Sequence, residues 1–88
     1  MKPIDFKGTN VVYAENQPEY NPLPAFKAEN GVMVTCWKLS QEDFEKIVET
    51  KKIYLSVMTF NNPLQPVYLT TDIDELLEFN EPENEEGK

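Results

Sequence analysis

The side chains best suited to chemistry in this chain are one thiol and two small groups of carboxylates. Cys36 is the single cysteine, and the sequence contains no histidine and no arginine. A cysteine nucleophile usually depends on a neighbouring base to form its thiolate, and histidine is the common base in such sites. Because the chain has no histidine, we interpret Cys36 as a small hydrophobic residue of the strand in which it lies.

The carboxylates fall into two groups that have an ordinary structural explanation. Glu42 and Asp43 form the first group, and Asp72, Asp74 and Glu75 form the second. Each group could hold a metal or act as an acid and base, but each also lies where a helix is expected to begin and where negative charge is favourable. The sequence has no EF-hand loop, zinc-ligand spacing or P-loop. We therefore predict a non-enzymatic protein with no catalytic residues, no metal site and no cofactor.

The negative charge is concentrated at one end of the chain. Residues 1–71 carry eight acids and seven lysines, whereas residues 72–88 carry eight acids and one lysine. We predict a single domain over residues 1–79 and an acidic, disordered tail over residues 80–88, which has too few apolar groups to offset the entropy of ordering. This acidic end would repel nucleic acid, so no direct nucleic-acid binding is expected.

The elements that must position these groups fit an α+β domain. The prediction is a small, mainly antiparallel sheet of three to four strands, with one main helix over about 41–50 and a short C-terminal helix over about 72–79. The strand over 32–39 is apolar on both faces, so we expect it to be central, with Trp37 in the core. The other strands are expected over 10–14, 52–60 and 67–70.

The helix over 41–50 has the clearest local signals. Ser40 and Asp43 have the spacing of a capping box, in which each side chain accepts a hydrogen bond from the other residue's backbone. Phe44, Ile47 and Val48 form one apolar stripe along the helix.

A proline-rich segment, residues 17–24, follows the first predicted strand. Three prolines in seven residues favour an extended, polyproline-like crossing and disfavour a helix or a central strand. Two interpretations stay open: a rigid strap that covers a sheet edge, or part of a face that binds a partner. The candidate partner-binding residues are Tyr13, Gln17, Tyr20, Pro22 and Leu23.

Three stretches together resemble a family of small uncharacterised proteins of bacteriophages and prophages. They are residues 10–24 (NVVYAENQPEYNPLP), 35–40 (TCWKLS) and 52–66 (KIYLSVMTFNNPLQP). The resemblance covers about residues 4–70 and implies a setting, the cytoplasm of an infected or lysogenic bacterium, but no activity. The chain departs from the family where Thr50-Lys51-Lys52 replaces a short glycine-containing turn, and in its acidic tail.

These observations lead to one expected function and two alternatives. We expect a phage-type accessory protein that binds a host or phage macromolecule, with a protein as its partner. One alternative is a protein that sequesters a nucleotide, using tyrosines together with Lys7, Lys27 or Lys38. The other is an acidic inhibitor that mimics nucleic acid.

Location and assembly are also predicted from the apolar residues. No apolar run approaches the roughly 20 residues that span a bilayer, and the first residues lack an export signal, so we expect a cytoplasmic protein without membrane contact. Apolar strands in a small domain leave edges to cover, so a homo-oligomer is expected.

Overall fold

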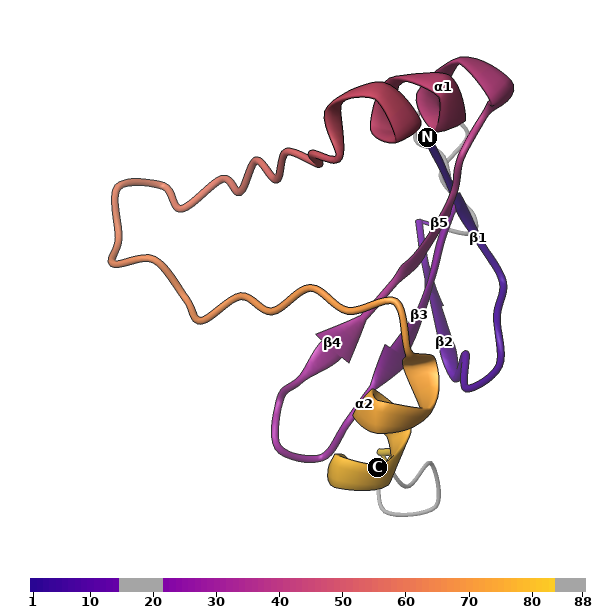
Figure 1. Cartoon of the computed structure of the whole chain (residues 1–88). Helices are drawn as coiled ribbons and strands as arrows, with labels where there is room; N and C mark the ends of the chain where they lie inside the picture. Colours follow the sequence, from indigo (N-terminus) through magenta and orange to yellow (C-terminus); the bar gives the residue numbers. More distant parts are fainter. Residues whose placement is uncertain (15–21, 84–88) are drawn as a thin grey trace.

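The computed structural model describes residues 1–14 and 22–83, which form two helices and two small antiparallel sheets (Figure 1). The predicted α+β class, with one main helix and a short C-terminal helix, is confirmed. The strands are β1 (Lys2–Ile4), β2 (Val11–Tyr13), β3 (Leu23–Lys27), β4 (Met33–Val34) and β5 (Cys36–Lys38). The helices are α1 (Gln41–Thr50) and α2 (Ile73–Phe79).

The predicted strand over 32–39 is divided between the two sheets. Its first part, β4, pairs with β3 in a sheet of order β2-β3-β4, and its second part, β5, pairs with β1 alone. The prediction that this strand is central and covered on both faces is therefore wrong. Trp37 is not a core residue, since it is 49% exposed and its indole N–H donates to the Thr35 hydroxyl at 2.9 Å. Alternating apolar residues predict burial only where other elements come to cover both faces, and here they do not.

The proline-rich segment ends inside a strand, contrary to the prediction of a crossing that runs to residue 24. Pro24 lies in β3, directly opposite Val12 of β2. A proline has no backbone N–H to donate to a neighbouring strand. It is tolerated here because β4 pairs only with Phe26 and Lys27, so β4 does not lie beside Pro24. Residues 17–21 of the predicted crossing lie outside the described part of the chain.

The hydrophobic core is small and lies between β3, β4 and α2. Its buried residues are Ala25, Phe26, Ala28 and Val34. Three residues of α2, together with Phe6 and Val32, pack against this cluster. The α2 residues that do so are Ile73, Leu76 and Leu77.

Helix α1 begins and ends where the sequence predicts, at Gln41 and Thr50. The capping box is present: the Ser40 hydroxyl accepts from the Asp43 N–H at 3.1 Å, and the Asp43 carboxylate accepts from the Ser40 N–H at 3.0 Å. No residue of α1 is buried, however, and Phe44 and Val48 of the apolar stripe are more than half exposed. The helix therefore presents its apolar stripe to solvent in the single chain.

The two strands predicted over 52–60 and 67–70 are absent, and this is the largest correction. Residues 53–70, named the arm here, leave the end of α1 as an open, extended loop and return to the start of α2 (Figure 1). At the tip, Phe60 and Asn61 have positive φ angles of 55° and 65°, and the Asn62 N–H donates to the Thr59 carbonyl at 3.0 Å. Turns of this kind close β-hairpins, yet the two legs of the arm form no ladder in the described structure.

Residues 81–83, which the sequence places in a disordered tail over 80–88, are paired with the end of β3 and the residues after it. Pro82 forms a β-bridge with Ala28, and the Glu83 N–H donates to the Lys27 carbonyl at 2.9 Å. The Glu29 N–H donates to the Glu81 carbonyl at 3.0 Å. Residues 81–83 thus continue the sheet beside the end of β3, because backbone hydrogen bonds, and not apolar side chains, hold them. Residues 84–88 lie outside the described residues, and the single-domain organisation stays a prediction.

Candidate functional site

The candidate catalytic side chains are spread over the molecule, and the structure gives each one a local role. Cys36 is half-buried and lies opposite Ile4 in the β1–β5 ladder. Asp72 caps α2 by accepting from the Asp74 N–H at 3.1 Å, and the Asp74 carboxylate pairs with the Lys7 ammonium at 2.5 Å. Within residues 1–14 and 22–83, no three metal-ligating side chains come together.

Asp43 is the carboxylate whose protonation is most affected by its surroundings. The α-ammonium group of Met1 lies 2.9 Å from its Oδ2, and the backbone N–H of Ser40 donates to the same oxygen at 3.0 Å. These contacts favour the ionised form, with the ammonium as the largest cause, and lower the pKa of Asp43 to about 2. The charge therefore ties the start of the chain to the N-terminus of α1.

The predicted partner-binding residues are only partly brought together. Tyr13 and Leu23 lie directly opposite each other in the β2–β3 ladder, with Tyr13 40% exposed and Leu23 half-buried. Directly opposed residues of antiparallel strands have neighbouring side chains on one face of the sheet. Gln17 and Tyr20 lie outside the described residues.

Pro22 belongs to a different surface. Together with Pro24 it lines a groove of about 520 Å³, whose other lining residues come from the start of the chain. Successive side chains of a strand point to opposite faces, so Leu23 points away from the side on which Pro24 lies. The groove is lined by Lys2, Pro3, Ile4, Asp5, Pro22 and Pro24.

The lysines proposed for nucleotide binding differ in their surroundings. Lys7 pairs with Asp74, and the Lys27 ammonium lies 3.3 Å from a carboxylate oxygen of Glu83. Lys38 instead lies opposite Lys2 across the β1–β5 ladder. Lys7 and Lys27 are therefore each paired with a carboxylate, whereas Lys38 lies beside a second positive charge, that of Lys2.

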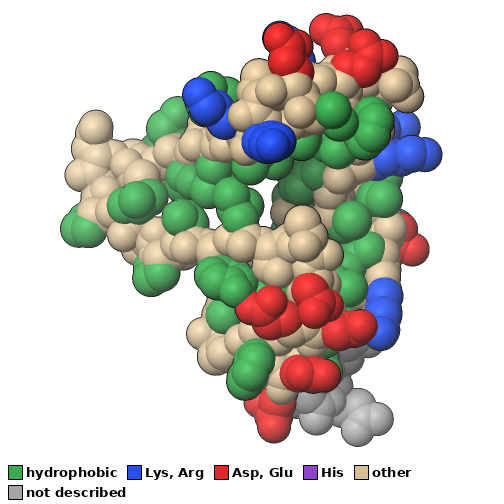
Figure 2. Space-filling view, viewed as in Figure 1, with side chains coloured by type: hydrophobic (Ala, Val, Ile, Leu, Met, Phe, Trp, Pro, Cys, Tyr) green, Lys and Arg blue, Asp and Glu red, His purple; other side chains and the backbone are tan. Residues whose placement is uncertain are grey.

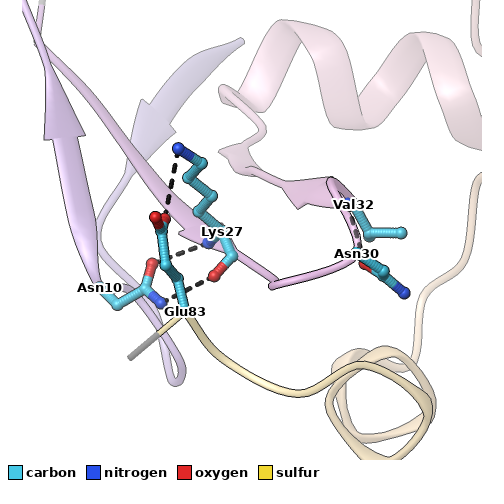
Figure 3. A network of polar contacts seen from close by, with 5 residues as sticks. All are labelled: Asn10, Lys27, Asn30, Val32 and Glu83. Atoms are coloured by element: carbon cyan, nitrogen blue, oxygen red, sulfur yellow. Dashed lines mark hydrogen bonds and ion pairs between the residues drawn. The ribbon is translucent and has the colours of Figure 1, made fainter. Parts of the chain in front are cut away.

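A polar network joins Asn10 and Glu83 to Lys27 at the end of β3 (Figure 3). The Asn10 side chain binds both backbone groups of Lys27: its oxygen accepts from the Lys27 N–H at 2.7 Å, and its NH₂ donates to the Lys27 carbonyl at 3.0 Å. The same carbonyl accepts from the Glu83 N–H, and Lys27 and Glu83 also form the ion pair. The Asn10 side chain thus makes the two backbone hydrogen bonds that a paired strand would make with Lys27. It does so just beyond the last residue pair of β2 and β3.

The arm is the surface that the sequence-based prediction of functional residues missed. It contains no charged residue, although 27% of the chain is charged, and its apolar side chains are each at least 46% exposed. Figure 2 shows acidic and basic side chains over the helices, while the arm is hydrophobic and uncharged. The run of 18 uncharged residues was the available signal, but its pattern predicts strands over 52–60 and 67–70. Its exposed apolar side chains are Ile53, Tyr54, Leu55, Val57, Met58, Phe60, Leu64, Val67, Tyr68 and Leu69.

The base of the arm is fixed to α2. The hydroxyl groups of Tyr68 and Thr70 both donate to the carboxylate of Glu75. The hydrogen bond to this carboxylate, followed by its charge, raises the pKa of Tyr68 above 10.0, because both favour the protonated phenol. The second leg of the arm is therefore attached where it meets the helix.

Comparisons with known proteins do not assign this chain to a family. A scan against models of protein families, a search of curated proteins and a search of solved structures each found no match. Among the described residues, neither helix is long and apolar enough to cross a bilayer.

Proposed function

We propose that this protein is a non-enzymatic accessory protein of the bacteriophage type, which acts by binding a protein of the phage or its host. The observation that carries the proposal is the Tyr13–Leu23 pair on the end strand β2. It places a partly exposed aromatic ring beside an apolar side chain on one face of a sheet. Aromatic side chains of this kind contribute strongly to protein interfaces, since they bury a large area with few rotatable bonds.

The position of the pair suggests how a partner would bind. Strand β2 stands at the end of the order β2-β3-β4, and end strands bind extended segments of other proteins by adding a strand. In that mode the backbone supplies affinity, and the side chains on each face supply specificity. In this mode Tyr13 determines which partner segment binds, and Leu23 lies beside it on the same face of the sheet.

The test is a capture experiment with matched variants of β2. Tyr13→Thr removes the ring and introduces a β-branched residue that favours strands, and Val12→Thr introduces the same residue at the neighbouring position, which points to the other face. Val12 and Tyr13 are 39% and 40% exposed, so the two changes are comparable in burial. Each purified variant is used as bait in lysate from phage-infected bacteria, and the retained proteins are quantified by mass spectrometry.

The proposal predicts a protein that wild type and Val12→Thr retain equally and that Tyr13→Thr retains at least about tenfold less. Equal retention by both variants would exclude Tyr13 as the contact. Both variants should show the circular dichroism spectrum of wild type. Turnover of a substrate by the purified chain would contradict the non-enzymatic assignment.

A second candidate function, nucleotide sequestration, is favoured by one specific contact. Lys2 and Lys38 face each other across two strands, and like charges so placed repel unless an anion lies between them. Lys2 also lines the groove beside Pro22 and Pro24. A thermal-shift panel of nucleotides tests this candidate: stabilisation that is lost in Lys38→Gln would support it, and no stabilisation by any nucleotide would exclude it.

A further inference from the structure

We propose that the arm is a dimerisation element, and that a second copy of this chain covers the arm and the apolar stripe of α1. The inference goes beyond the proposed function, because it concerns a different surface from the Tyr13–Leu23 pair. It is argued from the surface area of the chain, the composition of the arm and the size of the core.

The accessible surface of the single chain is too large for its mass. The chain exposes 7674 Å², whereas a compact monomer of 10.2 kDa exposes about 5,300 Å². The radius of gyration is likewise 14.7 Å, against about 12 Å for 88 residues in a compact domain. The excess is about 2,400 Å² per chain over all 88 residues, so a symmetric pair that buried about half of it would hide about 2,400 Å², within the range of permanent homodimers.

The arm has the chemistry of a buried interface and not of a surface loop. Its 18 residues are uncharged, and ten of them are apolar or aromatic side chains that solvent reaches. Tyr54 is 87% exposed and Phe60 is 78% exposed. Among the described residues, the arm has one backbone-to-backbone hydrogen bond, at its tip, so its extended legs leave unpaired groups that a neighbouring strand can satisfy.

The small core indicates that the partner is needed for folding. Within residues 1–14 and 22–83, four residues are buried, and two of them are alanines. The single chain hides about half of the surface of its unfolded form, compared with about 64% for a compact domain of this mass. A partner on which folding depends must be present whenever the chain is made, and a second copy of the chain always meets that condition.

Charge also favours a second copy. Two chains that each carry a net charge of −8 repel unless they meet through a neutral surface. The arm is such a surface, because charge is absent between Lys52 and Asp72. The exposed stripe of α1, with Phe44 and Val48, adds further uncovered apolar side chains on the helix from which the arm leaves.

The test compares the solution mass of the wild-type chain with that of two matched variants. Phe60→Asp places a charge at the tip of the arm, where aspartate tolerates the positive φ. Phe79→Asp makes the same change at the end of α2, in a side chain that is 80% exposed. Sedimentation velocity is measured from about 1 to 100 µM.

The proposal predicts a wild-type mass of twice 10.2 kDa, a dimer in Phe79→Asp, and dissociation at least about 30-fold easier in Phe60→Asp. A wild-type mass of 10.2 kDa throughout would overturn the proposal. So would a dimer equally stable in both variants, because the arm would then lie outside the interface.

A second measurement uses only the wild-type chain, so it tests the proposed dimer even if Phe60→Asp fails to fold. In a dimer, amide hydrogens of the arm exchange slowly at high protein concentration and faster on dilution, and the melting temperature rises by about 5 °C over a hundredfold concentration range. Arm amides that exchange within seconds at every concentration would overturn the proposal.

Discussion

Replacement of Asn10 by alanine tests whether one side chain fixes the end of β3. Asn10 makes two hydrogen bonds to the backbone of Lys27, at 2.7 and 3.0 Å, in a half-buried position. Asn10→Ala removes both bonds and leaves the Lys27 N–H without its acceptor, while the Lys27 carbonyl keeps the bond from Glu83. Removal of one partner from a buried backbone group costs about 1–3 kcal/mol, and the surviving bond limits the loss. We expect the free energy of unfolding to fall by about 1.5–3 kcal/mol.

Asn30→Ala is the matched control. Asn30 also makes two hydrogen bonds, accepting from the Val32 N–H at 3.0 Å and donating to the Asn80 side chain at 2.9 Å (Figure 3 shows the first). Both bonds are exposed, so water replaces them and the cost is below about 1 kcal/mol.

The two variants are compared with wild type by urea denaturation and thermal melting at one protein concentration. At this chain length 1 kcal/mol lowers the melting temperature by about 4–8 °C. Asn10→Ala should therefore melt roughly 6–24 °C lower than wild type, and Asn30→Ala within about 8 °C of it. Equal losses in the two variants would refute the reasoning, since burial would then not decide the cost.

Three further predictions concern stability and acid titration. Gly8→Ala should lower the melting temperature by at least about 4 °C. Gly8 has a φ of +105°, and an added Cβ would lie 2.9 Å from Leu77 Cδ2. An unchanged melting temperature would count against this contact. Asp43 should titrate near pH 2 by carboxyl NMR, because the Met1 ammonium, followed by the Ser40 N–H, favours its ionised form. These contacts stabilise the fold above the ordinary pKa of 3.8 and are lost as the pH falls toward 2; a titration near 3.8 would show that they do not form. Lys51→Gly should raise the free energy of unfolding by up to about 1 kcal/mol, because Lys51 ends α1 with a φ of 56°, and a loss of stability would contradict the assigned left-handed cap.

Local signals in the sequence predicted the helices well. The bounds of α1 follow from Ser40 and Asp43, which bond to each other's backbone and need no distant part of the chain. The short helix α2 follows in the same way from Asp72, which caps its first turn. Val11–Tyr13 is β-branched and aromatic, and it forms β2 within the predicted range.

Pairing partners could not be predicted from the same signals. The alternating pattern over 52–60 is that of a strand, but a strand forms only where another strand or chain supplies its hydrogen bonds. Pro24 looked incompatible with a sheet because its neighbours across β3 are set by distant residues. Trp37 was expected in the core because the predicted sheet would have covered it.

The candidate site was predicted only in part. Tyr13 and Leu23 were grouped by proximity in the sequence, and the structure brings them together by register. Pro22 was placed in the same group, but it lines a groove with Pro24. The arm was not predicted as an exposed surface because its composition fits two arrangements. An apolar strand of this kind can be buried inside a monomer, or it can be exposed until a second chain covers it.

The central claim is that the arm of one chain packs against another copy, and isotope-filtered NMR tests it most directly. A sample is unfolded and refolded as an equal mixture of ¹³C-labelled and unlabelled chains, and nuclear Overhauser effects are recorded between the two kinds. In the proposed dimer, intermolecular effects arise from arm side chains such as Leu55 and Phe60. Their absence from the arm, in a sample concentrated enough for the chains to associate, would contradict the claim.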